Sequence, residues 1–428
     1  ANGVEWREAS QTMVVRGLLP DGHPRLGAGP AAESGWHAIW AAHLESFLQA
    51  DAVDDPFAGG AKEALGRRLV RPAAMPSEAR ADPHTIPPPG MTLSAAALGL
   101  PPARAEDRPY RQKGGESRAL ELFGSFLSER AQSYSGSISS PNSAWTACSR
   151  LSPYLAWGHL SIRTVWQNAE ARRLEAKGGN WKRSLRAFLL RLQWRIYNCQ
   201  RFEMRCWMEK RNTCSAWEHL LHGKTYHFGD MSLLNGLSDE ERLEAFEQGR
   251  TGYPMVDACM RCLLQTGWLN FRMRCMLVSF AVYNLWLDWR CIAGHMARCF
   301  LDYEPGIHYP QLQMQAGTTG CDLRCYSIAR QAKDQDPKGD FIRKYVEELS
   351  GIPGSAVLEP WKIPVTSSIG KLASRYPPRI VDELKTSKAS KSVVAALQQW
   401  FQKRSSSAEA PPPLEELLAK QRRSTTTA

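Results

Sequence analysis

Residues 251–290 read TGYPMVDACMRCLLQTGWLNFRMRCMLVSFAVYNLWLDWR. Apolar side chains recur in this stretch every three to four residues, which is the spacing of an α-helix. Its most apolar part, MLVSFAVYNLWL at 276–287, is shorter than the roughly 18 apolar residues that a membrane span needs. We therefore expect a buried helix in a protein core here, and no membrane span.

Helical periodicity continues on both sides of this stretch, between residues 114 and 350. In the segment 114–134, Leu120, Phe123 and Leu127 have the spacing of one apolar stripe. Alternating strand patterns are almost absent from the whole region. The predicted fold class is therefore all-α, built around one large helical domain.

One helix has start and stop signals that can be read directly. In LSDEERLEAFEQG at 237–249, Ser238 and Glu241 have the spacing of a capping box. Gly249 follows the last helical position, where a glycine commonly ends a helix.

The composition divides the chain into three parts. Residues 1–113 are rich in Gly, Pro and Ala and predict an irregular N-terminal extension or linker, with a helix at 35–48. Residues 114–362 form the predicted helical domain. Residues 363–428 are rich in Lys, Ser and Pro and predict a mobile basic tail with one helix near 392–401.

Charge and cysteine content indicate the setting of the protein. The 428 residues carry a formal net charge of +11, which favours a polyanionic partner such as DNA. The eleven cysteines are scattered, so we expect a reducing intracellular compartment, without distinguishing nucleus from plastid. Cys259 and Cys262 have no second pair at matching spacing, and we predict buried thiols and no metal site.

A run of hydroxyl side chains precedes a helical pattern at 147–166. Ser149 and Ser152 stand at its start, and Pro153 suits the first helical position. Hydroxyls and free N–H groups at a helix start can bind a phosphate. The alternative is an ordinary capped helix.

Several blocks in a fixed order across residues 110–360 together resemble the FAD-binding helical domain of the photolyase/cryptochrome family. They are Ser149 to Leu155, Trp194-Arg195, Thr251 to Ala258, Thr266 to Trp268, Asp288 to Arg290 and Asp336 to Arg343. The resemblance implies an all-helical domain that holds a bent FAD. It also implies that residues 1–113 are the end of an α/β antenna domain and its linker, so we expect no antenna chromophore here.

The resemblance assigns cofactor-binding positions. Arg274 and Asp302 match a buried ion pair at the flavin edge, for which the alternative is a purely structural pair. His308 matches the position that faces flavin N5, although an ordinary core histidine is the alternative. The remaining matches to cofactor contacts are Tyr134, Ser149, Arg150, Leu151, Ser152, Leu155, Arg195 and Glu304.

The chain departs from the family in the tryptophan relay that supplies electrons for photoreduction. Trp289 matches the middle member of that relay, but Leu312 stands where the inner member is expected. A leucine cannot be oxidised, and Trp286 is a candidate substitute. The predicted photochemical residues are therefore His308, Trp289 and Trp286, with core packing as the alternative role for the indoles.

A second departure lies in the predicted DNA or substrate pocket. Arg191 replaces a glutamate, and a guanidinium cannot accept the hydrogen bonds of a flipped base. With Arg195, Arg201 and Arg205 it would present positive charge to phosphates, unless these side chains form an ordinary solvated helix face. The predicted pocket comprises Arg191, Trp194, Trp268, Phe271 and Met314.

Three functions follow from this comparison. The altered relay and pocket favour a blue-light photoreceptor-type flavoprotein that signals to a protein partner or larger complex. The first alternative is a DNA photolyase that repairs pyrimidine dimers with light. The second alternative is a helical scaffold without photochemistry.

Overall fold

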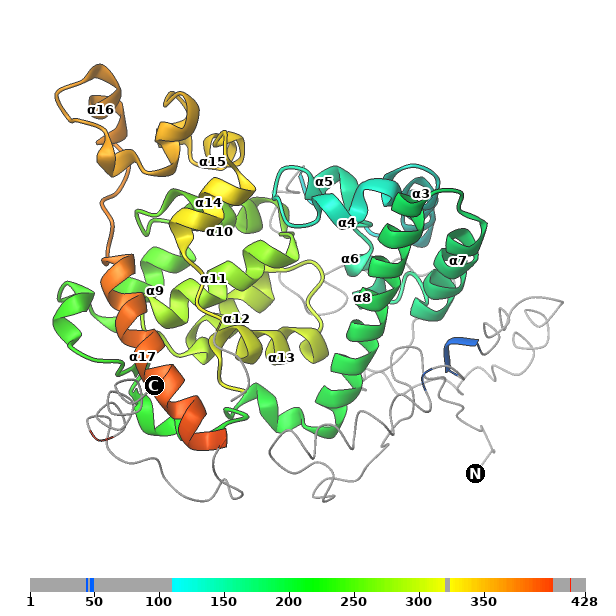
Figure 1. The fold of residues 1–428 in the computed structure, drawn as a ribbon, viewed down its shortest axis with the longest axis horizontal. Coiled ribbons are helices and arrows are strands. Elements are labelled where there is room, and N and C mark those ends of the chain that lie inside the picture. Colours follow the sequence, from blue (N-terminus) through cyan, green and yellow to red (C-terminus); the bar gives the residue numbers. More distant parts are fainter. Residues whose placement is uncertain (1–43, 45–46, 50–109, 320–323, 403–415, 417–428) are drawn as a thin grey trace, which may run out of the picture. The chain divides into compact units, whose positions relative to one another are not determined.

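A computed structural model describes residues 44, 47–49, 110–319, 324–402 and 416, and the regular secondary structure of this part of the chain is almost entirely helical (Figure 1). The all-α prediction is confirmed. The only strands among these residues are β1 (Leu221–His222) and β2 (Thr225–Tyr226), which pair antiparallel with Leu221 opposite Tyr226. Most of 1–113, including nearly all of the helix predicted at 35–48, lies outside the described residues.

The helices fall into longer elements and short connecting turns. The α-helices are α3 (Glu116–Ser128), α4 (Tyr134–Ser137), α5 (Ala144–Ala147), α6 (Ser152–Ala156), α7 (Ile162–Glu175), α8 (Gly179–Met204), α9 (Asp239–Glu247), α10 (Pro254–Thr266), α11 (Phe271–Tyr283), α12 (Trp289–Cys299), α13 (Pro305–Ala316), α14 (Ile328–Gln335), α15 (Asp340–Tyr345), α16 (Ser368–Ala373) and α17 (Glu383–Gln402). The 3-10 helices are η3 (Arg130–Ser133), η4 (Cys206–Glu209), η5 (Ser215–Leu220), η6 (Met231–Leu234), η7 (Glu347–Leu349), η8 (Gly354–Leu358) and η9 (Pro360–Lys362). Within the described residues, no helix is long and apolar enough to cross a membrane.

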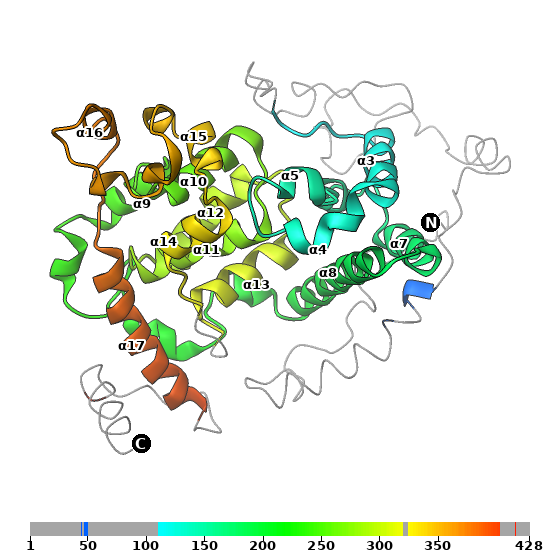
Figure 2. The ribbon, with the colours of Figure 1, turned by 45° about the horizontal axis from the view of Figure 1, so that its top comes forward.

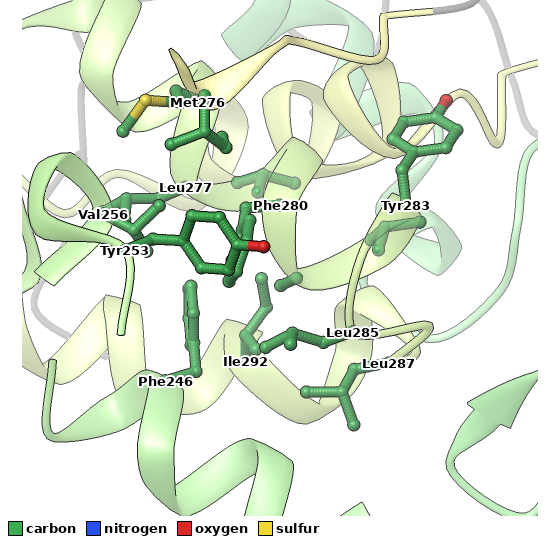
Figure 3. Packing of buried hydrophobic residues seen from close by; sticks show 14 of the residues in the cluster. Phe246, Tyr253, Val256, Met276, Leu277, Phe280, Tyr283, Leu285, Leu287 and Ile292 are labelled. Atoms are coloured by element: carbon green, nitrogen blue, oxygen red, sulfur yellow. The ribbon is translucent and has the colours of Figure 1, made fainter. Parts of the chain in front are cut away.

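The larger hydrophobic core is centred on α10 and α11. Pro254 begins α10 and Gly267 ends it with φ 71°, a left-handed conformation that a glycine adopts at little cost. Phe280 of α11 packs against Tyr253, and side chains from α9 and α12 join the same cluster (Figure 3). Every residue of 276–287 is buried, as predicted. The helix ends earlier than expected, at Tyr283, before the chain turns with a φ of 58° at Trp286.

A second core lies where α8 packs against α7, and the two helices run side by side in both ribbon views (Figures 1 and 2). On another side, α8 contacts α13 closely. A Cβ at Gly306 of α13 would lie 2.7 Å from the Cα of Cys199 in α8. The absence of a side chain at Gly306 therefore permits the backbones of these two helices to approach each other.

Two local predictions have different outcomes. The capping box of Ser238 and Glu241 is present, and Gly249 follows the end of α9 with φ 63°. The apolar stripe of α3 was predicted in part: Phe123 is buried as expected, but the other buried residues are Ala119 and Phe126, and Leu120 is half exposed. Ala119 and Phe126, each one residue before a predicted position, are buried more completely than Leu120 and Leu127.

The segment from 363 to 402, expected to belong to a mobile tail, contains the short helix α16, a non-helical connection and the long helix α17. Helix α17 starts at Glu383, well before the predicted 392–401 helix. Ser390 Oγ donates to the Tyr283 carbonyl at 2.6 Å, and Asn284 Nδ2 donates to Thr386 Oγ1 at 3.2 Å. These hydrogen bonds hold α17 against α11, while residues 403–428 of the predicted tail, apart from 416, lie outside the described residues.

Candidate functional site

Arg274 and Asp302 form a two-bond ion pair between α11 and the loop before α13. Arg274 Nη1 and Nη2 lie 3.0 and 2.8 Å from the two Asp302 carboxylate oxygens, and the guanidinium lies 4.1 Å from the Phe300 ring centroid. Burial opposes ionisation of Asp302, but Arg274 and the Ser152 hydroxyl hold the pKa of Asp302 below its ordinary value. The predicted ion pair is therefore present, with a half-buried Arg274 and a buried, ionised Asp302.

The serine run brings one of its two hydroxyls to this pair. Ser152 opens α6, and its side chain hydrogen-bonds Asp302. Ser149 Oγ instead accepts a weak hydrogen bond from the Leu151 N–H at 3.5 Å. Leu151 and Leu155 are buried in the core shared with α8. Ser152 is thus the member of the run that touches the buried ionic site.

Arg150 is held by two tryptophans. Its guanidinium carbon lies 4.0 Å from the Trp145 ring centroid and 4.1 Å from that of Trp268. Arg150 also exchanges side-chain and backbone hydrogen bonds with Gln112. Burial lowers the pKa of Arg150 to about 10. Its guanidinium is therefore occupied by contacts with Trp145, Trp268 and Gln112. A contact between this residue and a cofactor would have to come from another atom of Arg150.

Glu304 and Arg195 form a second ion pair between α13 and α8, at 3.3 Å. Glu304 also caps α13 by accepting from the Gly306 N–H. Two buried polar atoms of α8, Arg195 Nε and Asn198 Oδ1, have no hydrogen-bond partner in the protein. Buried polar atoms are normally paired, so a donor and an acceptor left open here fit a polar ligand.

His308 lies one turn along α13 from Glu304 and is buried. Its Nε2 lies 3.0 Å from the Ala293 carbonyl oxygen, and the rings of Phe300, Tyr303 and Tyr309 pack edge-on around it. Burial lowers the pKa of His308 to about 4, although the Ala293 carbonyl favours the charged form. His308 is therefore a neutral imidazole at physiological pH.

The predicted photochemical indoles are both completely buried. Trp289 donates its N–H to Asn212 Oδ1 at 2.7 Å. Trp286 packs edge-on against Phe228 in the core around β2, and its N–H has no partner. Leu312 is buried in α13, so an aliphatic side chain does occupy the predicted break in the relay.

The predicted pocket residues do not all lie together. Arg191 and Trp194 are exposed on α8, and Arg191 lies 5.9 Å from the ring centroid of the exposed Phe271. Trp268 is only 5% exposed and packs against Trp145, so it does not share the exposed surface of Arg191 and Trp194. Met314 is half-buried on α13.

The predicted cationic face of α8 is also smaller than expected. Arg201 and Arg205 are buried, and Arg195 is largely covered and paired with Glu304. The side chains that α8 exposes are Asn180, Lys182, Arg183, Arg186, Leu190, Arg191 and Trp194. The basic surface therefore lies on the first two thirds of the helix.

Three further predicted residues lie in the core, and two residues near the site were not predicted. Tyr134 is buried between Phe126 and Phe188, and burial raises the pKa of its hydroxyl. Cys259 and Cys262 are fully buried in α10, as predicted. Trp145 and Tyr309 were missed, because each acquires its role from contacts with distant segments and no local motif marks it.

Comparisons with known proteins agree with this geometry. Residues 188–396 match the family model for the FAD binding domain of DNA photolyase. The chain is 31% identical to a deoxyribodipyrimidine photo-lyase of Alkalihalophilus pseudofirmus over 65% of this chain and 55% of the relative. It is 30% identical to a cryptochrome DASH of Gloeobacter violaceus over 78% of this chain and 63% of that protein. The chain thus spans a little over half the length of these relatives.

A solved class III photolyase from Agrobacterium tumefaciens has a similar fold, with a TM-score of 0.61 at 24% identity, covering 72% of this chain and 62% of that one. A Synechocystis cryptochrome superposes with a TM-score of 0.57 over 68% of this chain and 58% of that structure. The fold and the buried ionic site define a helical, FAD-binding domain. Residues 188–396 carry the FAD-binding domain of the photolyase/cryptochrome family.

Proposed function

We propose that the protein is a FAD-dependent, blue-light photoreceptor-type flavoprotein. The observation that carries this proposal is Arg191, an exposed cation over Phe271 beside Trp194. The resemblance implies a carboxylate at position 191 in a repair enzyme, where it accepts hydrogen bonds from a flipped base. A guanidinium offers only donors, so it opposes that recognition.

The residues proposed to hold FAD are those of the buried ionic site. Arg274, Asp302 and Ser152 form one hydrogen-bonded group, while Arg195 and Asn198 leave a donor and an acceptor open. The bound flavin would supply light absorption and one-electron chemistry. The task of the protein residues is to orient the ring edge, exclude water and keep His308 neutral.

The first experiment asks whether the purified protein is yellow and releases FAD on denaturation. Blue light should then reduce the bound flavin, followed by its absorbance. Protein that retains no flavin would exclude both photochemical functions and leave the scaffold alternative.

A second experiment separates light sensing from repair. The flavin is reduced chemically, which bypasses any deficiency in the electron relay, and the protein is illuminated with an oligonucleotide that contains a pyrimidine dimer. We expect no repair by the unaltered protein. Arg191→Glu should increase dimer binding, whereas the matched control Arg186→Glu on the same helix should not. Repair by the unaltered protein would contradict the proposal.

DNA repair is the second candidate function, and one observation favours it. Trp194 and Phe271 are 47% and 49% exposed, and exposed aromatic rings beside cations can stack bases while the cations bind phosphates. Several relatives carry the name deoxyribodipyrimidine photo-lyase. A polyanion such as DNA is therefore the proposed partner of this surface, in addition to a protein that receives the light signal.

A further inference from the structure

Tyr309 lies between Trp289 and His308. Its ring centroid is 6.4 Å from that of Trp289 and 5.2 Å from that of His308, and the ring planes meet at 70° and 79°. Leu312, almost one turn further along α13, is buried and cannot give up an electron. Tyr309 is thus an oxidisable side chain in contact with both the buried indole and the imidazole.

Tyr303 is a second phenol in the same cluster. Its ring centroid is 5.3 Å from that of His308, and its hydroxyl hydrogen-bonds the hydroxyl of Tyr309. Both tyrosines are half-buried, whereas Trp289 is completely buried. The phenols can therefore exchange protons with water, and the indole cannot.

Oxidation of a phenol requires such an exchange. A phenol that loses an electron becomes a strong acid, so an oxidisable tyrosine needs a hydroxyl or base that accepts its proton. The Tyr303 oxygen can accept a hydrogen bond as well as donate one. Trp289 bonds only to the neutral Asn212 amide, which is no base. Of Tyr309 and Trp289, only Tyr309 therefore has a partner that can accept its proton when it loses an electron.

We propose that Tyr309 is a redox-active residue that links Trp289 to the His308 side of the flavin site, with Tyr303 as its proton partner. The inference rests on the proposed function, because the oxidant is photoexcited, oxidised FAD. Tyr309 gives one electron to that oxidant and its O–H bond breaks. The proton passes through the Tyr303 hydroxyl to water, and a neutral tyrosyl radical remains. An external thiol then returns one electron and one proton.

The test identifies the radical by electron paramagnetic resonance in the FAD-loaded protein under blue light. Protein grown with ring-deuterated tyrosine should give a narrower light-induced spectrum than unlabelled protein, because the hyperfine coupling comes from tyrosine ring hydrogens. This labelling changes no side chain, so it does not depend on the folding of a variant. A spectrum that is unaltered by labelled tyrosine would overturn the proposal.

Substitutions locate the radical within the chain. Tyr309→Phe should lose the tyrosyl signal, and Tyr309→Trp should replace it with an indolyl signal, since the residue remains oxidisable. Tyr303→Phe should slow formation of the signal and increase its solvent isotope effect. The control is Tyr345→Phe, a change at a tyrosine of α15 whose hydroxyl bonds Cys262. Its spectrum should equal that of the unaltered protein.

The outcomes separate this inference from the proposed function. If FAD binds and is reduced by light while Tyr309→Phe keeps the tyrosyl signal, only the role of Tyr309 is refuted. If the protein retains no FAD, both proposals fail.

Discussion

The hydroxyl of Tyr376 donates a hydrogen bond to the buried carboxylate of Asp257, which lies 119 residues earlier in the chain. The same carboxylate accepts from the backbone N–H groups of Thr251 and Gly252, at 2.8 and 3.1 Å. One side chain of α10 therefore fixes both the loop that precedes this helix and the segment that leads to α17.

We predict that Tyr376→Phe lowers the free energy of unfolding by about 2 kcal/mol, because it removes a hydrogen bond to a buried carboxylate. The comparison is Tyr154→Phe, whose hydroxyl donates to the neutral Lys113 carbonyl at 2.8 Å and should contribute about 1 kcal/mol. Urea unfolding of both variants measures the difference. A smaller loss for Tyr376→Phe than for Tyr154→Phe would show that Asp257 does not carry this contact.

The ion pair of Arg274 and Asp302 gives a prediction about both stability and flavin. Asp302→Asn keeps the shape but removes the charge that compensates Arg274, and breaking a buried pair should cost about 3 kcal/mol. The exposed pair of Arg118 and Glu121 is the control, and Glu121→Gln should change stability by less than about 1 kcal/mol.

The pH dependence follows from the lowered pKa of Asp302. Its stabilising effect is present above the pKa of the unfolded carboxyl and is lost as the pH falls through the folded pKa. Flavin release should increase over the same acidic range. Equal flavin retention by Asp302→Asn and Glu121→Gln would mean that the pair has only a structural role.

His308 should make the folded protein sensitive to a different range of pH. Its pKa is about 4 when folded, against an ordinary value of 6.5, so below pH 6.5 the unfolded chain binds the proton more readily. Stability therefore falls as the pH drops from 6.5 to 4, by up to about 3 kcal/mol. In His308→Ala this part of the pH dependence should disappear from denaturant curves.

The same variant tests the role of His308 toward the flavin. We expect His308→Ala to change the rate of flavin photoreduction at pH 7 without unfolding the domain. Photoreduction kinetics identical to those of the unaltered protein would refute a photochemical role and leave an ordinary core histidine.

The sequence predicted two kinds of structural feature: those formed by residues close together in the chain, and those implied by motifs that occur in the order typical of the family. The α9 capping box is local, and the pairing of Arg274 with Asp302 followed from the family resemblance. The contact of Arg150 with both Trp145 and Trp268 was not predictable, because the segment that carries Arg150 and Trp145 must meet the distant segment that carries Trp268.

The arginines of α8 show a second limit of sequence analysis. A run of cations on a helix is usually solvated, but Arg201 and Arg205 are buried near the end of α8. Their burial depends on packing that brings other elements over this part of the helix, which no periodicity in α8 itself reports.

The close contact of α8 with α13 gives the last prediction. A methyl group at Gly306 would lie 2.7 Å from the Cα of Cys199 and 3.1 Å from its Sγ, so Gly306→Ala must push the helices apart. We expect a loss of about 1–3 kcal/mol, the usual cost of overpacking a core. Because the nearest atom belongs to the backbone, adding Cys199→Ala should not restore stability. Gly294→Ala on α12 is the matched control, since its methyl group would meet only the flexible end of the Arg298 side chain and the substitution should be neutral or stabilising.

Separation of α8 and α13 would also lengthen the 3.3 Å contact between Arg195 and Glu304, so flavin affinity should fall in Gly306→Ala and not in Gly294→Ala. Unchanged affinity in Gly306→Ala would show that the spacing of α8 and α13 does not set the flavin site.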